Sequence, residues 1–314
     1  MQKGKVIKST GKWYRVLLPD GEIVSCRIRG KIRLDGLRST NPVAVGDEVF
    51  ISMQEKEKTG IIHKIEPRKN YIVRKSINLS KKTQLLATNI DRAYLLVTLV
   101  APETHLAFVD RFLVAAESFR IPVTLLFNKI DIYSEEHLPI IDEIIAIYKP
   151  LGYPCHKISA RDKKSIDFLK KEIKHKQVMI AGHSGTGKST LINNLDNTLN
   201  IKTESISKYH LQGQHTTTFA EMHQLQSGGF IIDTPGIKAF GVIDLEKEVM
   251  GHYFPEIRTL MNKCRFHNCL HINEPDCAVK EAVELGAISD SRYATYLDLM
   301  QEDQEENYRK DIYG

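Results

Sequence analysis

Gly182-His183-Ser184-Gly185-Thr186-Gly187-Lys188-Ser189 is an eight-residue stretch that directly follows the apolar run 178–181. It fits the phosphate-binding pattern G-x-x-x-x-G-K-[ST] at a point where a strand passes into a helix. Its glycines let the backbone take positive φ and turn N–H groups toward phosphate oxygens, and the helix dipole favours the same anion. We expect Lys188 to reach the β- and γ-phosphates and Ser189 to ligate Mg²⁺, and the expected GTP contacts extend to Thr190.

The sequence around this P-loop alternates between strand and helix patterns. Apolar runs predict strands at 93–100, 123–127, 156–158, 178–181, 219–225 and 230–232. Helices are expected at 106–120 and 138–148, and a shorter one places Ile166, Leu169 and Ile173 on one face. Apolar strands separated by helices indicate an α/β fold with a parallel sheet covered on both faces.

A second motif, Asn128-Lys129-Ile130-Asp131, follows the strand predicted at 123–127, at the carboxyl end where α/β sheets bind ligands. The carboxylate of Asp131 can accept hydrogen bonds from N1–H and the amino group of guanine. Adenine offers no such donors, so its binding would leave the carboxylate unpaired at a cost of about 1–3 kcal/mol. We expect Asn128 to address the other base edge and Lys129 to lie along the sugar or base plane. Together with the P-loop, this motif predicts a guanine nucleotide site.

Three further segments complete the expected site. Ser159 and Ala160 end the next strand, where a backbone N–H can reach guanine O6. Asp233 and Gly236 belong to a D-x-x-G motif, whose carboxylate holds Mg²⁺ and whose glycine N–H senses the γ-phosphate. The segment 213–218, with the sequence GQHTTT, can offer a threonine hydroxyl to Mg²⁺, and among its three threonines we choose Thr217.

These motifs stand in an unusual order along the chain. Ras-like GTPases begin with the P-loop and carry N-K-x-D late, whereas here N-K-x-D comes first. We therefore predict the same sheet with the chain cut elsewhere, that is, a circularly permuted Ras-like P-loop GTPase domain. The D-x-x-G segment, which is the second of the two nucleotide-sensing switch segments, then ends the domain. Nucleotide-dependent movement of this segment can therefore pass into the C-terminal segment.

The residue after D-x-x-G excludes the usual Ras mechanism. Ras-like proteins place a glutamine there to orient the attacking water, but here the position is Ile237, which cannot hydrogen-bond. Hydrolysis then needs a group from a partner or from elsewhere in the switch. His215 is the local candidate, since imidazole near neutral pH can orient or deprotonate water. A solvent-exposed loop histidine is the alternative.

Residues 1–70 predict a small basic β-barrel. Alternating strands at 5–7, 13–17, 23–28, 48–51 and 60–65 fit an OB-fold-like barrel, and the alternation alone also fits an SH3-like one. This segment holds fifteen Lys and Arg against eight Asp and Glu, a local charge of +7. Five of the cations follow one strand and the loop after it: Arg27, Arg29, Lys31, Arg33 and Arg38. The pattern favours a nucleic-acid partner, with a solvated surface as the alternative.

The C-terminal segment carries Cys264, Cys269, His271 and Cys277 within fourteen residues. Three thiolates and one imidazole form a structural zinc set without an open coordination position. His267 is a rival to His271 as the nitrogen ligand, and buried free cysteines are the alternative to a metal site. Helical patterns on both sides of the cluster predict a small α-helical zinc-binding domain.

The chain of 314 residues is too long for one ordinary core, so several domains are expected. We divide it into a barrel at 1–70, a GTPase domain at 71–242 and a zinc-binding domain at 243–314. A hydrophobic content of 42% is typical of globular proteins, and no apolar run is long enough to span a membrane. We expect a cytoplasmic monomer without membrane contact.

Over nearly its whole length the chain resembles the RsgA (YjeQ) family of bacterial ribosome-biogenesis GTPases. The resemblance rests on the four nucleotide motifs and on the Cys/His spacing with its Glu274-Pro275; His183 and Thr186 depart from the expected side chains without endangering phosphate binding. It implies a factor that binds GTP and GDP and joins the small (30S) ribosomal subunit and its rRNA late in assembly. It also implies that the subunit stimulates hydrolysis and that His215 is catalytic. From the residues alone, a GTP-binding RNA-contacting module with negligible turnover and a large-subunit assembly GTPase stay open.

Overall fold

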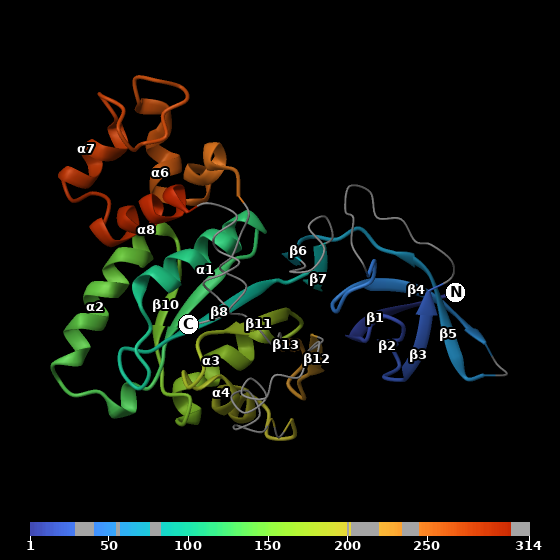
Figure 1. Cartoon of the computed structure of the whole chain (residues 1–314). Helices are drawn as coiled ribbons and strands as arrows, with labels where there is room; N and C mark the ends of the chain where they lie inside the picture. Colours follow the sequence, from blue (N-terminus) through green and yellow to red (C-terminus); the bar gives the residue numbers. More distant parts are fainter. Residues whose placement is uncertain are drawn as a thin grey trace, which may run out of the picture.

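The computed structural model describes residues 1–28, 41–54, 57–75, 83–199, 201, 220–233 and 245–302. Three parts can be distinguished in Figure 1: a barrel near the N-terminus, a central α/β sheet, and a helical C-terminal part that lies over α1 and α2. No helix in the described ranges is long and apolar enough to cross a membrane.

The N-terminal part is a closed five-stranded barrel. Its strands are β1 (Gln2–Ser9), β2 (Tyr14–Leu17), β3 (Ile23–Ile28), β4 (Glu48–Gln54) and β5 (Thr59–Ile65). They pair in the order β1-β2-β3-β5-β4, and β4 returns to β1, with β3 and β5 parallel. Alternate residues of each strand point inward, so that Val16, Val24 and Ile62 are buried in one core. The expected OB-like barrel is confirmed.

The central sheet has the strand order β10-β9-β8-β11-β13-β12. Parallel pairing joins β8 (Arg92–Val97), β9 (Val123–Phe127), β10 (Cys155–Lys157), β11 (Gln177–Ala181) and β13 (Phe230–Asp233). The strand β12 (Glu221–Gln224) instead pairs antiparallel with β13, so the expectation of a fully parallel sheet is wrong at this edge. The cause is the short turn between the two strands, because a parallel connection needs a long crossover.

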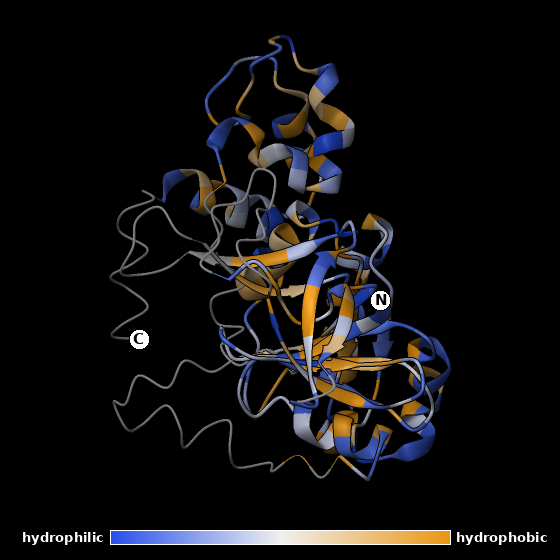
Figure 2. Cartoon of the chain, turned by 90° about the vertical axis from the view of Figure 1, so that its right-hand side faces the viewer, coloured by the Kyte–Doolittle hydropathy of each residue, from blue (hydrophilic) through white to orange (hydrophobic). Residues whose placement is uncertain are grey.

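Helices cover both faces of the sheet, as the continuous apolar strands predict. On one face α1 (Leu106–Ser118) and α2 (His137–Tyr148) enclose a core that includes Leu95, Phe112 and Met179. On the other face α3 (Lys163–Ile173) and α4 (Lys188–Leu195) enclose a second core. Short 3₁₀ turns, η1 (Ile130–Ile132) and η2 (Lys149–Leu151), follow β9 and α2. In Figure 2 hydrophobic positions concentrate on the strands, between more hydrophilic loops.

The barrel and the central sheet are joined in two ways that the sequence did not indicate. A hairpin of β6 (Tyr71–Lys75) and β7 (Thr83–Thr88) lies between them, in a segment where the sequence predicted no strand. In addition, β1 pairs antiparallel with β12, which makes eleven strands continuous. At this contact Lys8 Nζ lies 3.0 Å from Glu221 Oε2.

The C-terminal part consists of η4 (Lys247–Tyr253), α6 (Pro255–Leu260), η5 (Met261–Lys263), α7 (Ala278–Glu284) and α8 (Asp290–Gln301). Its core contains Phe254, Ile257 and Tyr296, and it also takes in Val114 from α1. This part therefore packs directly on the helix layer of the central sheet.

Candidate functional site

The P-loop connects β11 to α4, as its sequence predicts. Gly182, Gly185 and Gly187 have φ of +139°, +83° and +99°, which other residues rarely adopt. A Cβ at Gly187 would collide with the amide of Asn128. Ser189 lies in the first turn of α4 and is buried. The backbone N–H groups of this turn and the helix N-terminus form the kind of cradle that binds phosphate.

Side chains of the P-loop are held by the loop itself and by α1. Lys188 Nζ donates to the carbonyl oxygens of Gly182 at 2.8 Å and of His183 at 2.5 Å. Thr186 Oγ1 also donates to the His183 carbonyl, at 2.9 Å. The His183 ring lies 3.7 Å from the ring of Phe108 on α1. The P-loop backbone is therefore bonded to Lys188, and its His183 side chain packs on α1.

The side chain of Asn128 joins three of the expected motifs. Its Nδ2 donates to the carbonyl oxygen of Thr186 in the P-loop at 2.7 Å. Its Oδ1 accepts from the Ala160 N–H at 2.8 Å. Residues 128, 160 and 186 come from segments far apart in the chain, yet they meet at the carboxyl ends of β9, β10 and β11. Both polar atoms of the Asn128 side chain thus have protein partners, whereas we expected this side chain to address a base edge. The Ala160 N–H, which we expected at guanine O6, donates to Asn128 instead.

The carboxylate of Asp131 lies beside the segment that follows β10. Ser159 Oγ donates to Asp131 Oδ1 at 2.6 Å, and the Arg161 N–H donates to the same hydroxyl at 3.3 Å. Lys129 takes a left-handed conformation with φ of +70°, and its ammonium donates to the Ala101 carbonyl. Desolvation and the nearby charge of Arg161 lower the pKa of Lys129. Asp131 itself is exposed.

Several predicted residues lie outside the described ranges. They are the switch candidates His215 and Thr217, the D-x-x-G residues Gly236 and Ile237, and the barrel cations Arg29, Lys31, Arg33 and Arg38. For Asp233 the backbone is described, as the last residue of β13.

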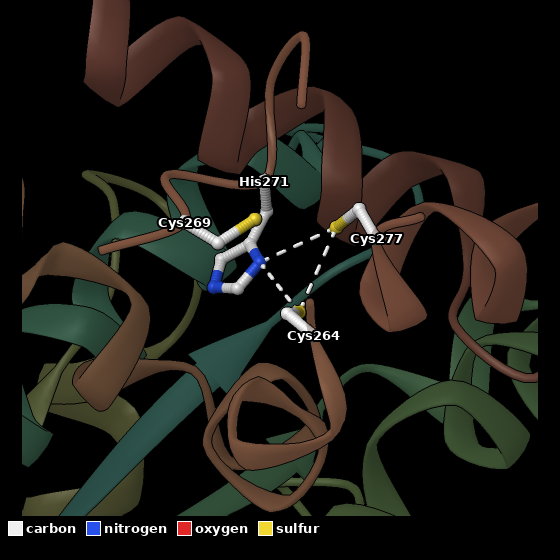
Figure 3. A group of neighbouring side chains, drawn as sticks. All are labelled: Cys264, Cys269, His271 and Cys277. Atoms are coloured by element: carbon white, nitrogen blue, oxygen red, sulfur yellow. Dashed lines mark hydrogen bonds between the residues drawn. The ribbon is translucent and has the colours of Figure 1, made fainter. Parts of the chain in front are cut away.

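Figure 3 shows that the four predicted zinc ligands converge on one point. Their ligand atoms all lie within 4.8 Å of one another, and His267 is not part of the group. The Nδ1 atom of His271 is 3.5 Å from Cys264 Sγ and 3.4 Å from Cys277 Sγ, and the two sulfurs are 3.9 Å apart. A tetrahedral zinc ion with ordinary bond lengths separates two sulfurs by roughly 3.8 Å and sulfur from nitrogen by roughly 3.5 Å. The donor set fits zinc in type and spacing.

Burial and backbone hydrogen bonds determine the charge of the groups around this cluster. Burial raises the pKa of Cys269 to about 12, so a stable thiolate there requires positive charge nearby. The Glu274 carboxylate accepts from the backbone N–H groups of Leu270, Ile272 and Asn273 at 2.8, 2.9 and 3.1 Å. Burial alone would raise the pKa of Glu274, but these donors lower it. We did not predict from the sequence that Glu274 holds this loop. The position of a carboxylate between the ligand positions His271 and Cys277 is a signal that could have indicated it.

Comparisons with known proteins agree over almost the entire chain. The family model described as RsgA GTPase matches residues 65–243, and the RsgA N-terminal domain model matches residues 3–62. The small ribosomal subunit biogenesis GTPase RsgA of Christiangramia forsetii is 53% identical over 313 residues, which is 99% of each chain. RsgA 2 of Bacteroides thetaiotaomicron is 51% identical over 98% of this chain and 99% of its own.

Two solved structures share the complete architecture. The crystal structure of YjeQ from Thermotoga maritima aligns with a TM-score of 0.76 and 34% identity, over 95% of this chain and 97% of that one. YloQ, described as a circularly permuted GTPase, aligns with a TM-score of 0.73 and 30% identity, over 98% and 96%. The predicted circular permutation is confirmed.

Proposed function

We propose the function of this chain from one premise: the chain belongs to the RsgA family of GTPases. It hydrolyses GTP to GDP and phosphate. Relatives of matching length are named for the biogenesis of the small ribosomal subunit, and we extend that role to this chain. It binds the small subunit late in maturation, in the cytoplasm, is stimulated there to hydrolyse GTP, and then leaves.

The main observation that supports the proposed nucleotide site is the contact of the Asn128 side chain with both Thr186 and Ala160. It holds the N-K-x-D loop against the P-loop, so we expect one nucleotide to touch both. Asp131 then reads the guanine base, and Ser159 orients its carboxylate. The contacts made by Asn128 are a means of aligning these loops, in addition to any contact with the base.

The P-loop supplies the phosphate contacts. Backbone N–H groups at 182–190 and the N-terminus of α4 receive the phosphates, and Lys188 turns from its own carbonyl partners toward the β- and γ-oxygens. The position of Ser189 in the first helical turn suits a ligand for Mg²⁺, with Thr217 and Asp233 as the other proposed ligands. Bound Mg²⁺ neutralises charge on the β- and γ-phosphates.

For the attacking water we propose His215, because Ile237 offers no hydrogen bond at the usual position. An imidazole with an ordinary pKa near 6.5 can accept a proton at neutral pH.

The zinc ion has a different role. Cys264, Cys269 and Cys277 with His271 hold it as a closed structural site that fixes the loops between α6 and α8.

The barrel is the proposed rRNA-contacting part. Its first 70 residues carry the charge of +7, and Arg27 lies 3.9 Å over the ring of Trp13 on the outer surface. A guanidinium stacked on an aromatic ring offers both positive charge and a flat surface for a base. The charge and this pair support an RNA partner.

Sedimentation with purified small subunits tests the function directly. The chain is incubated with subunits in GDP or in a non-hydrolysable GTP analogue, and the pelleted fraction is measured. We expect strong binding in the analogue, weak binding in GDP, and faster multiple-turnover hydrolysis when subunits are added. Binding to large subunits instead, or hydrolysis that small subunits do not accelerate, would contradict the proposal.

A further inference from the structure

The strands β8 and β9 separate at the nucleotide end of the sheet in a specific way. They pair in parallel as far as Val97 and Phe127, and the ladder continues with Asn128 N–H donating to the Val97 carbonyl at 2.9 Å. In a regular parallel ladder the next bond runs from the Leu99 N–H to the Asn128 carbonyl. Here the hydroxyl of Tyr133 stands between these two groups. It accepts from the Leu99 N–H at 2.8 Å and donates to the Asn128 carbonyl at 2.8 Å.

Tyr133 is held in this position by its own surroundings. It directly follows η1, its side chain is half-buried against the core under α1 and α2, and its ring stacks on His137 at 5.6 Å. Burial raises the pKa of Tyr133, so the hydroxyl keeps the proton that it donates. The phenol is a fixed spacer between two strands.

The loop on the far side of this spacer, residues 98–104, is closed on itself. Thr104 N–H donates to the Thr98 carbonyl at 2.8 Å, and Thr98 N–H donates to Thr104 Oγ1 at 3.1 Å. The same loop accepts the Lys129 ammonium at Ala101. The N-K-x-D segment is therefore attached to this internally hydrogen-bonded loop at two places, through Tyr133 and through Lys129.

We propose that Tyr133 is a positioning residue for guanine specificity, whose hydroxyl sets the spacing between the N-K-x-D segment and loop 98–104. The inference rests on the proposed guanine site at Asp131. The Asn128 side chain is tied to the P-loop, while its carbonyl is tied to Tyr133. Without the hydroxyl, the Asn128 carbonyl and the Leu99 N–H either lose their partner or bond directly and close the gap. In both cases Asp131 is displaced relative to the base.

The substitution Tyr133→Phe tests this, with the affinities for GTP, GDP and ITP as readouts. ITP lacks the 2-amino group, so it depends less on Asp131 than GTP does. We expect GTP and GDP to bind about tenfold more weakly, the preference for GTP over ITP to shrink, and kcat at saturating GTP to change by less than about twofold. The matched control is Tyr153→Phe, whose hydroxyl bonds Glu117 near the amino end of β10, away from the carboxyl ends of the strands, and should leave all three affinities unchanged.

Two results would overturn the proposal: unchanged GTP affinity in Tyr133→Phe, or a weaker affinity with the GTP-to-ITP preference of the wild type. The second result would mean that the hydroxyl supports the fold and not base reading. A wild-type protein that binds GTP no better than ATP would instead refute the guanine site itself, so the two failures can be told apart.

Discussion

Replacing Arg292 by methionine removes a buried guanidinium that joins α8 to two other helices. Arg292 is 1% exposed and donates to Glu256 on α6 at 2.7 and 3.2 Å and to Asp110 on α1 at 2.9 Å. Asp110 also accepts from the hydroxyls of Tyr148 at 2.7 Å and Thr295 at 3.0 Å. Burial alone would lower the pKa of Arg292, but the two carboxylates raise it, so the side chain stays charged.

The size of the loss follows from the charges left behind. Arg292→Met leaves Asp110 and Glu256 buried without their shared cation, and removing one partner of a buried pair costs about 3–5 kcal/mol. The chain can escape by protonating one carboxylate, which from an ordinary pKa near 4 costs about 4 kcal/mol at pH 7. The two estimates agree. We therefore expect the free energy of unfolding to fall by about 4 kcal/mol.

Urea unfolding followed by circular dichroism measures this difference, with Arg258→Met as the matched control. Arg258 also joins the C-terminal part to α1, through Glu117 at 3.4 Å, but its side chain is 49% exposed. An exposed pair contributes about 1 kcal/mol or less, so the control should change little. Adding Asp110→Asn and Glu256→Gln to Arg292→Met removes the stranded charges and should recover more than half of the lost stability.

An Arg292→Met variant that is no less stable than Arg258→Met would contradict this expectation. A triple variant as unstable as Arg292→Met alone would also contradict it, because the loss of stability would then come from lost packing and not from unpaired charge.

Four other substitutions test the proposed sites. Asp131→Asn should weaken GTP binding and shift base preference toward xanthine nucleotides; competition binding measures this, and an unchanged preference would rule out base reading by Asp131. Ser189→Ala should impair Mg²⁺-dependent GTP binding and turnover, and kinetics like those of the wild type would exclude it as a ligand. His215→Ala should keep nucleotide affinity but lower kcat by about 10²–10⁴-fold in a steady-state GTPase assay. An unchanged kcat would exclude His215 from proton transfer. Cys277→Ser should lower the zinc content measured by elemental analysis, and one full equivalent per chain would argue against the assigned ligand set.

The candidate sites that could be predicted from the sequence are those with local signals. The P-loop and N-K-x-D are each written in adjacent residues, and both follow apolar strands. Since parallel strands end at the same edge of a sheet, their meeting could be inferred before any coordinates. The contact between Asn128 and Thr186 bears out that geometry, although it uses the asparagine side chain differently from our expectation. The cysteine spacing was equally local, and only the choice between His267 and His271 needed coordinates.

The features that were missed depend on residues distant in sequence. Arg292 and Asp110 are 182 positions apart, and no pattern in either helix announces a buried ion pair. Tyr133 looks like an ordinary residue after a motif until Leu99, 34 positions earlier, lies beside it. The hairpin of β6 and β7 is too short for its alternation to stand out. Its burial depends on Val45 of the barrel and on the central core, because strand formation follows packing more than propensity.

The arrangement of the accessory parts gives the circular permutation a structural meaning. β12 and β13 lie between residues 202–219 and 234–244, where the switch motifs are expected. β12 pairs with β13 on one edge and with β1 of the barrel on the other. An edge strand that is covered in this way cannot shift without changing its pairing to the barrel. On the other side, the C-terminal part packs on α1, which also places Phe108 against His183 of the P-loop. Both accessory parts therefore contact the GTPase fold one element away from the loops proposed to hold the nucleotide, and directly bonded or packed neighbours link them to those loops.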